Sequence, residues 1–249
     1  MCGFPLILVI RSRELNSRTC TLGIVVGTIY LGGGGGALDE AAVWRRMLKG
    51  KSRLVYWPFA LEPERALAAT EWLTRSLRNL DLHIQVETWT DLATRNPEQL
   101  ESAELLFVGG GNTFRLLHHV RQHGFLDAVR EFVESGGTYY GGSAGALLAC
   151  ANVEIALGLD QNEVDLTDLS ALGLLKSFDV LPHFTPTQLA DTRDWSSQHG
   201  RVVLGIPERS GLALGEGTAE VLGTEPVSEV SEDEVTVHRP GTHWVWSTG

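Results

Sequence analysis

The sequence predicts an α/β fold with a mostly parallel sheet covered by helices. Strand-like and helix-like patterns alternate along the chain from about residue 26 onward, and this alternation is typical of repeated βαβ units. The chain has 249 residues, 43% of them hydrophobic, which is enough for one α/β domain of ordinary size. No Pro/Ser-rich linker or internal repeat divides the sequence, so we expect one domain over residues 26–249.

The first clear element is the stretch GTIYLGGGGGALDEAAVW, residues 27–44, which predicts a strand, a glycine loop and a helix. Before it, the apolar run PLILVI lacks a preceding basic region and is followed by Arg11 and Arg13, so it makes a poor secretory signal. We expect residues 1–25 to be a loosely attached extension, explained by a start site assigned too far upstream.

The middle of the chain continues the alternation. Pro63 suits the first residue of a helix, and the next apolar residues fall at helical spacing on one face. Gly136 and Gly137 suit the end of another helix. The expected strands are RLVYWPFA (53–60), LHIQVET (82–88), ELLFVGG (104–110) and TYYGG (138–142), and the expected helices carry Ala69, Leu73, Leu77 and Leu80, and Phe125, Leu126, Val129, Phe132 and Val133.

Beyond residue 200, short apolar and alternating stretches predict strands and β hairpins that close the far side of the sheet. These stretches are RVVLGIP, SGLALG, AEVLG and EVTVHR.

Composition excludes several classes of protein. The formal net charge is −11 and no basic run is present, which argues against a nucleic-acid partner. The apolar stretches are too short to span a bilayer, so no membrane association is expected. Cys2, Cys20 and Cys150 form no C-x-x-C pair or disulfide framework, and a reducing cytoplasm is therefore the expected location.

One serine lies in a glycine-rich turn. Residues 141–145 read Gly-Gly-Ser-Ala-Gly and fit G-x-S-x-G, placed where a strand must turn directly into a helix. Such a turn projects the serine hydroxyl from the carboxyl edge of the sheet. Ser143 is therefore either a nucleophile or a small residue at the apex of a tight turn.

A second glycine-rich strand end supports the nucleophile. In LLFVGGGNTFRLL, residues 105–117, Asn112 and Thr113 suit the start of a helix. Adjacent strand ends present backbone N–H groups at one sheet edge. The amides of Gly111 and Ala144 are candidates to hold the oxyanion of a tetrahedral intermediate.

A serine nucleophile needs a base. His183, in DVLPHFTP, follows a strand-like segment and a proline, which puts it on a loop at a strand end. We expect His118, His119, His123, His238 and His243 to be solvated. His119 and His123 are four residues apart but lack the glutamate of H-E-x-x-H, so we expect no metal.

The run of five glycines at residues 32–36 is the main feature that points to a cofactor. G-x-G-x-x-A can be traced from Gly32 to Ala37, but the next strand carries no acidic residue for a ribose. We therefore expect no dinucleotide and no other cofactor.

Four motifs in order, FVGGGNTFRLL, GGSAGALLAC, LPHFT and GIPERSGLAL, resemble peptidase family S51, which includes aspartyl dipeptidases (peptidase E) and cyanophycinases. The resemblance runs from about Gly27 to Gly223. It implies a flavodoxin-like three-layer α/β fold, akin to class I glutamine amidotransferases, with a serine nucleophile and a histidine base.

Carried over to this sequence, the resemblance implies Ser143 as the nucleophile, His183 as the base, and Gly111 with Ala144 as oxyanion donors. It implies either Glu208, in IPERS, or Asp160, in LGLDQNEV, as the acid that orients the histidine; Glu208 is the favoured choice.

For the substrate, the resemblance implies Arg193, in ADTRDW, as the partner of an aspartyl side chain, because a guanidinium can make two parallel hydrogen bonds to a carboxylate. Asn112 is a further candidate substrate contact. Gly142 departs from peptidase E, which has a bulky aromatic residue before its serine, and this changes the expected pocket wall.

Together with the residues around Ser143, the resemblance implies a serine peptidase acting on short peptides, with a dipeptidase that prefers an N-terminal aspartate as the favoured form. The expected partner is the peptide substrate, and a homodimer is the candidate assembly. The alternatives are a cyanophycinase-like β-aspartyl peptidase, a carboxypeptidase-type enzyme, or a non-catalytic module that binds a small ligand on the same fold.

Overall fold

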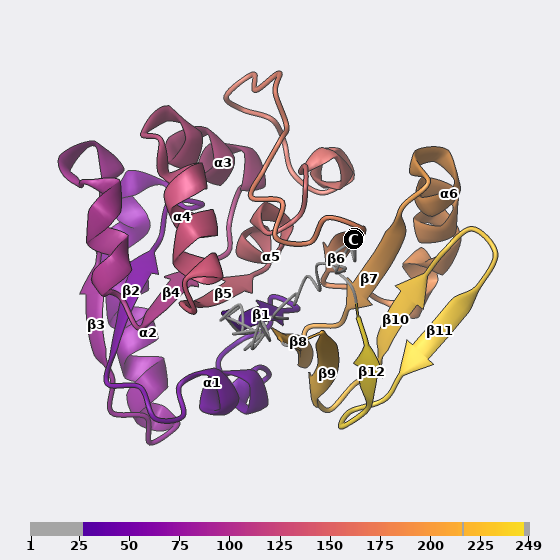
Figure 1. The fold of residues 1–249 in the computed structure, drawn as a ribbon, viewed down its shortest axis with the longest axis horizontal. Helices are drawn as coiled ribbons and strands as arrows, with labels where there is room; N and C mark the ends of the chain where they lie inside the picture. Colours follow the sequence, from indigo (N-terminus) through magenta and orange to yellow (C-terminus); the bar gives the residue numbers. More distant parts are fainter. Residues whose placement is uncertain (1–26, 216, 247–249) are drawn as a thin grey trace, which may run out of the picture.

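The computed structural model describes residues 27–215 and 217–246 (Figure 1). The predicted extension, residues 1–25, lies outside them. The main sheet has eight strands in the order β12-β9-β8-β1-β5-β4-β2-β3. They are β1 (Ile29–Gly32), β2 (Arg53–Trp57), β3 (Gln85–Thr88), β4 (Leu105–Val108), β5 (Thr138–Gly142), β8 (Ser210–Gly215), β9 (Thr218–Gly223) and β12 (His243–Val245).

Strands β1 to β5 pair in parallel, and β8, β9 and β12 extend the sheet by antiparallel pairing. The run β3-β2-β4-β5 follows the first four places of the flavodoxin strand order, and β1 takes the fifth. The carboxyl ends of β1, β5 and β4 therefore lie side by side, and the loops that follow them meet at one edge.

Helices cover both faces of the main sheet. Successive strand residues point to opposite faces, and apolar side chains on both faces are buried under helices. Tyr139 packs in the core with α3, α4 and α5, whereas Tyr140 packs in the core with α1 and α2. The predicted three-layer α/β sandwich is confirmed. The helices are α1 (Ala41–Met47), α2 (Ala66–Asn79), α3 (Thr113–Gln122), α4 (Phe125–Glu134), α5 (Ala144–Leu148) and α6 (Leu189–His199), with 3-10 turns η1 (Pro63–Arg65), η2 (Leu92–Thr94), η3 (Pro97–Ser102), η4 (Glu154–Gly158) and η5 (Pro186–Gln188).

The region beyond residue 200 was expected to add strands to the far side of one sheet, but the chain beyond residue 170 also forms a second sheet. Strands β6 (Phe178–Pro182), β7 (Val202–Ile206), β10 (Val227–Val230) and β11 (Val235–His238) make a separate four-stranded sheet in the order β11-β10-β7-β6. Figure 1 shows this sheet and α6 at the right of the molecule. Strands β6 and β7 are parallel, with α6 as their crossover, so this sheet also presents a carboxyl edge.

The two sheets share a core. Val180 and Leu204 of the second sheet belong to the same buried cluster as Leu31 and Val108 of the main sheet. We propose on this basis that the described part of the chain, residues 27–215 and 217–246, folds as one domain. No helix within residues 27–215 and 217–246 is both long and apolar enough to cross a membrane.

Several element predictions are confirmed by the structure. Pro63 begins η1, which leads into α2, and Leu73 and Leu77 on α2 are buried as expected. Helix α4 runs from Phe125 to Glu134. The expectation that His238 is solvated is wrong, because it is buried, bonded to Glu229 and stacked on Trp244.

Candidate active site

Ser143 lies in the sharp turn between β5 and α5. Its backbone φ is 51°, a region that residues with side chains adopt at a cost and that marks functional turns. The flanking glycines are required by close packing: a Cβ on Gly141 would lie 2.2 Å from the carbonyl oxygen of Gly145, and one on Gly145 would lie 2.5 Å from that of Val108. The turn therefore fixes the serine hydroxyl at the edge of the sheet.

His183 comes from the second sheet, directly after β6. Its Nε2 lies 2.9 Å from Ser143 Oγ. The residue also has a positive φ, 54°, and its backbone N–H donates to the carbonyl oxygen of Gly33 at 2.8 Å. The bond to the glycine loop holds His183 against the main sheet.

Glu208, directly beyond β7, completes a chain of contacts. Its Oε1 lies 2.9 Å from His183 Nδ1. A carboxylate can only accept a hydrogen bond, so Nδ1 carries the ring hydrogen and Nε2 is left to accept the proton of Ser143. The acid, the imidazole and the hydroxyl thus form a continuous chain of hydrogen-bonding contacts.

The other candidate acid, Asp160, has a different partner. Its Oδ2 accepts hydrogen bonds from the backbone N–H of Thr113, at 2.8 Å, and from the Thr113 hydroxyl. Asp160 therefore fastens the loop after η4 to the start of α3, while the contact to His183 is made by Glu208.

The glycine run that mimics a dinucleotide motif packs under these residues. A Cβ on Gly34 would lie 2.4 Å from the His183 ring, one on Gly33 would lie 1.9 Å from the carbonyl oxygen of Pro207, and one on Gly35 would lie 2.3 Å from that of Glu208. These glycines let the main sheet and the Pro207–Glu208 segment approach closely, which accounts for the run without a cofactor.

The expected oxyanion donors lie around Ser143. Gly111 has a φ of 136° and lines a cavity that also includes Ser143 and His183, while Ala144 is the first residue of α5. A Cβ on Gly110 would lie 3.1 Å from Ser143 Cβ. Two segments with backbone N–H groups, from β4 and from α5, thus flank the hydroxyl.

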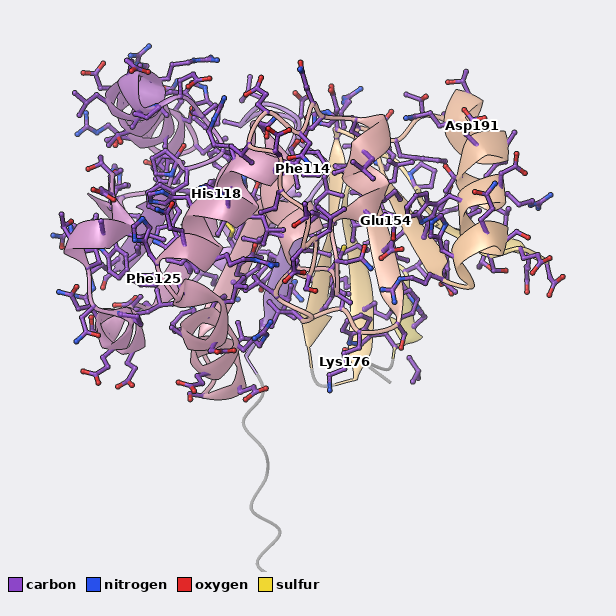
Figure 2. The ribbon with its side chains drawn as sticks, turned by 90° about the horizontal axis from the view of Figure 1, so that it is seen from above. Phe114, His118, Phe125, Glu154, Lys176 and Asp191 are labelled. Carbon is purple, nitrogen blue, oxygen red and sulfur yellow. The ribbon has the colours of Figure 1, made fainter. Side chains whose placement is uncertain are left out.

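The two expected substrate contacts lie differently. Asn112 caps α3: its Oδ1 accepts from the N–H of Arg115, and its Nδ2 donates to the carbonyl oxygen of Gln161 at 2.7 Å. Arg193 is exposed on α6, which Figure 2, labelled at Asp191, shows at the outer end of the molecule. Arg193 lines neither described cavity that includes Ser143.

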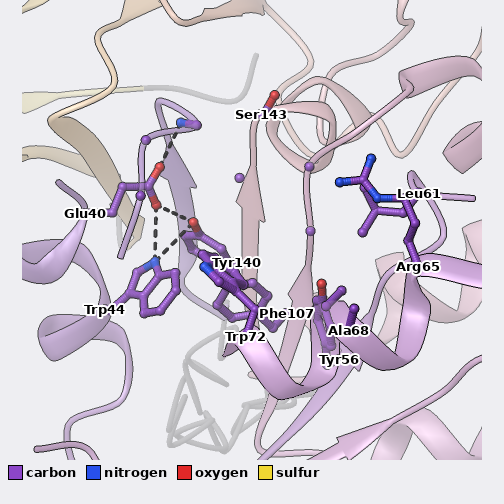
Figure 3. Close-up of a pocket in the computed structure, with 17 residues that line it drawn as sticks. Glu40, Trp44, Tyr56, Leu61, Arg65, Ala68, Trp72, Phe107, Tyr140 and Ser143 are labelled. Atoms are coloured by element: carbon purple, nitrogen blue, oxygen red, sulfur yellow. Dashed lines mark hydrogen bonds between the residues drawn. The ribbon is translucent and has the colours of Figure 1, made fainter. Parts of the chain in front are cut away.

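A cavity of about 550 Å³ opens beside Ser143, over the face of the main sheet that α1 and α2 cover (Figure 3). Five aromatic side chains line it, together with several glycines of the strand ends; the aromatic residues are Trp44, Tyr56, Trp72, Phe107 and Tyr140. The exposed residue Arg65 also lines the cavity, at the side opposite Glu40 (Figure 3).

A buried carboxyl group belongs to the same cavity. Glu40 is 1% exposed, and its oxygens accept hydrogen bonds from the backbone N–H of Gly34 at 2.7 Å, from Trp44 Nε1 and from the Tyr140 hydroxyl. Burial raises the pKa of Glu40 to about 7, and the hydrogen bonds only partly oppose this shift. Sequence reasoning missed Glu40; the signal was an acid directly before the first helix and four residues from a tryptophan.

His119 and His123 lie together on α3, near Asp91, with potential ligand atoms within 4.8 Å of one another. His119 is half-buried rather than solvated as expected. Its Nε2 accepts a hydrogen bond from the N–H of Leu92 at 3.2 Å, and burial lowers its pKa. The contact with Leu92 thus gives one ring nitrogen of His119 a partner within the protein.

This sequence and fold are similar to those of known proteins. The profile of peptidase family S51 matches residues 29–222. Peptidase E of Salmonella arizonae is 31% identical over 206 residues, which cover 81% of this chain and 83% of the relative. Peptidase E of Salmonella typhi is 35% identical over 158 residues, 60% of this chain and 62% of the relative.

A solved peptidase from an acI-B1 Actinobacterium superposes with a TM-score of 0.69 at 19% identity, covering 90% of this chain and 98% of the other, and so has the same fold. The profile spans both glycine-rich strand ends, the histidine loop and Glu208. The resemblance drawn from the four motifs is confirmed: the chain belongs to peptidase family S51 and is a serine-type peptidase.

Proposed function

We propose that this peptidase cleaves short peptides through Ser143, His183 and Glu208. The supporting observation is the pair of 2.9 Å contacts that link Ser143 Oγ, the two His183 ring nitrogens and Glu208 Oε1. The three side chains come from β5, β6 and β7 and meet at the carboxyl ends of these strands, where α/β proteins bind ligands.

The reaction proceeds in two halves. Ser143 Oγ attacks the peptide carbonyl carbon while His183 Nε2 takes the hydroxyl proton. The tetrahedral intermediate then collapses: the C–N bond breaks, His183 gives its proton to the leaving amine, and an acyl-serine ester remains. A water molecule then attacks the ester carbon while His183 Nε2 takes one of its protons. The bond between the acyl carbon and Ser143 Oγ breaks, His183 returns the proton to Oγ, and the carboxylic acid product leaves.

Glu208 holds His183 in the tautomer that this cycle needs and stabilises the imidazolium that forms transiently. The backbone amides of Gly111 and Ala144 stabilise the oxyanion. Loss of one such donor typically lowers the rate by about 100- to 1000-fold.

An N-terminal aspartate is the finer substrate assignment that the family resemblance implies. An enzyme that removes an N-terminal aspartate, with Arg193 on the aspartyl carboxylate, follows from the family resemblance alone, because Arg193 is exposed on α6 and lines neither described cavity at Ser143. Cleavage of β-aspartyl peptides or at a carboxyl terminus would use the same three side chains. We therefore propose short peptides as the substrate class.

The test is covalent labelling of the full chain with a fluorophosphonate, followed by intact mass measurement. The expected result is one added group on the wild type and none on Ser143→Ala, together with hydrolysis of a dipeptide panel by the wild type only. A wild type that is neither labelled nor active would refute the proposal and favour a non-catalytic binding module.

A further inference from the structure

Ser143 lies between two cavities of different chemistry. One is lined by His183, Asp160, Gly111 and Gln188. The other is the aromatic cavity, whose walls include Tyr56, Trp72, Phe107 and Tyr140. Both reach the nucleophile, so a substrate bound across Ser143 extends into each.

We propose that the aromatic cavity receives a large aromatic or branched apolar side chain from the residue whose carbonyl Ser143 attacks. This inference rests on the proposed function, because it assigns a part of the substrate to each side of the same nucleophile.

The proton transfer decides which part of the substrate lies in which cavity. His183 must reach the leaving amine in order to protonate it, so the leaving part of the peptide lies in the cavity that His183 lines. The acyl part then lies on the other side of Ser143, where His183 is not among the lining residues and the aromatic cavity opens.

The size of the cavity depends on Gly142. A Cβ at this position would lie 2.7 Å from the Tyr140 hydroxyl, so any side chain there would project against the cavity wall. The glycine leaves a space of about 550 Å³, within the range of pockets that bind small molecules, roughly 300–1000 Å³. An aspartyl side chain would leave most of it unfilled.

The walls favour an apolar group. Trp72 is 44% exposed although it is a large aromatic residue, and its ring lies edge-on to Trp44 with centroids 5.9 Å apart. Aromatic rings prefer such edge-on and offset contacts with another ring. A bound aromatic side chain would cover Trp72 and remove its apolar surface from water.

The charged groups of the cavity do not favour an acid or a base. The Glu40 oxygens are already occupied by Gly34, Trp44 and Tyr140, so they offer little to a cationic side chain. When Glu40 ionises, its buried charge repels a substrate carboxylate. Arg65 is exposed, where solvent screens its charge.

The proposal is tested with α-aminoalkyl diphenylphosphonates, which carry the side chain of the acyl residue and react with a serine nucleophile without needing a peptide. Analogues with Phe, Leu, Ala and Asp side chains are compared by the rate of mass increase on the full chain. The Phe analogue is expected to react at least about ten-fold faster than the Ala analogue, and the Asp analogue no faster than Ala.

A substitution that fills the cavity is compared with the same substitution at a neighbouring position outside it. Ala68 lies on α2 and lines the cavity (Figure 3), whereas its neighbour Leu67 is 73% exposed and is not a lining residue. Ala68→Phe should slow the Phe analogue by about ten-fold or more and the Ala analogue by less than about three-fold. Leu67→Phe should change neither rate, and Ala69→Leu serves as a second filling variant if Ala68→Phe does not fold.

The possible failures are distinct. If a fluorophosphonate labels Ser143 but the four analogues react equally, or none reacts, the cavity assignment is wrong and the proposed function stands. If the Asp analogue reacts fastest and Arg65→Gln removes that advantage, the cavity binds acids and the inference is overturned. If neither fluorophosphonate nor any analogue labels Ser143, the proposed function itself fails.

Discussion

The two sides of Ser143 are built in opposite ways. On one side, His183 and Glu208 are partly exposed, with side chains 45% and 59% accessible, and are held by hydrogen bonds at the ends of β6 and β7. On the other side, the aromatic cavity is formed by mostly buried rings of α1, β2, β4 and β5, with Trp72 of α2 at its wall.

This difference separates chemistry from selection. On the polar side, which carries His183 and Glu208, proton transfer depends on the positions of a few atoms, so single substitutions there should reduce the rate on every substrate. In the binding mode proposed above, the aromatic cavity contacts the substrate side chain and not the reacting atoms, so substitutions there should change which substrates react. Each prediction below tests one side of this division.

The largest effect is expected at His183. Because the nucleophile and its base act as a unit, His183→Ala should lower kcat by about 10⁵- to 10⁶-fold on a good dipeptide substrate, and the double variant Ser143→Ala/His183→Ala should lose no more than either single variant. Steady-state kinetics of the three proteins, with circular dichroism as the check on folding, measures this. Additive losses would mean that the two residues do not share one step.

Glu208 should come next. Glu208→Gln keeps the shape of the side chain but can stabilise the wrong His183 tautomer, so kcat should fall by about 10³- to 10⁴-fold. Asp160 hydrogen-bonds Thr113 and not His183, so Asp160→Asn should lower kcat by less than about ten-fold. The reverse ranking of the two variants would reassign the orienting acid to Asp160.

The polar side was largely predictable from sequence. Its residues lie in short local patterns: the glycines around Ser143, the proline before His183, and the proline before Glu208. Each pattern fixes a turn, and turns at the ends of parallel strands meet in space. Strands β1 to β5, β8 and β9 of the main sheet and helix α4 were predictable for a similar reason, because periodicity is a local signal.

The aromatic side and the second sheet were not predictable in this way. Tyr140 and Glu40 are a hundred residues apart and yet bonded, and the pairing of β10 with β7 depends on contacts that no local pattern specifies. Likewise, EVTVHR predicts a strand, but its pattern cannot show that His238 is buried against Trp244. Tertiary packing decides such positions, and local propensity does not.

Glu40 provides a test of the buried side through stability. Its folded-state pKa is raised to about 7, above its unfolded value, so its contribution to the free energy of unfolding is complete below about pH 4.5 and is lost as pH rises through 7. This amounts to about 3 kcal/mol across that range. Glu40→Gln should abolish this part of the pH dependence.

Denaturant unfolding of both proteins between pH 5 and pH 8 measures the effect. Glu64→Gln, at an exposed position on η1, is the control and should leave the wild-type slope. Parallel stability curves for wild type and Glu40→Gln would contradict the prediction, because they would mean that folding does not raise the pKa of Glu40.

The smallest effect is expected at Arg193, which lies on neither side of Ser143. Arg193 is exposed on α6, which packs against β7 and β10, so Arg193→Ala should change kcat/KM by less than about two-fold on Phe-Leu, Ala-Leu and Asp-Leu alike, as for most exposed substitutions. Lys176→Ala, another exposed cation of the described chain, is the matched control for the loss of one charge. A selective loss of about ten-fold or more on Asp-Leu would mean that α6 closes over the bound peptide and that the second sheet selects for an aspartyl residue. The division between a polar side that performs the chemistry and an aromatic side that selects the substrate would then be wrong.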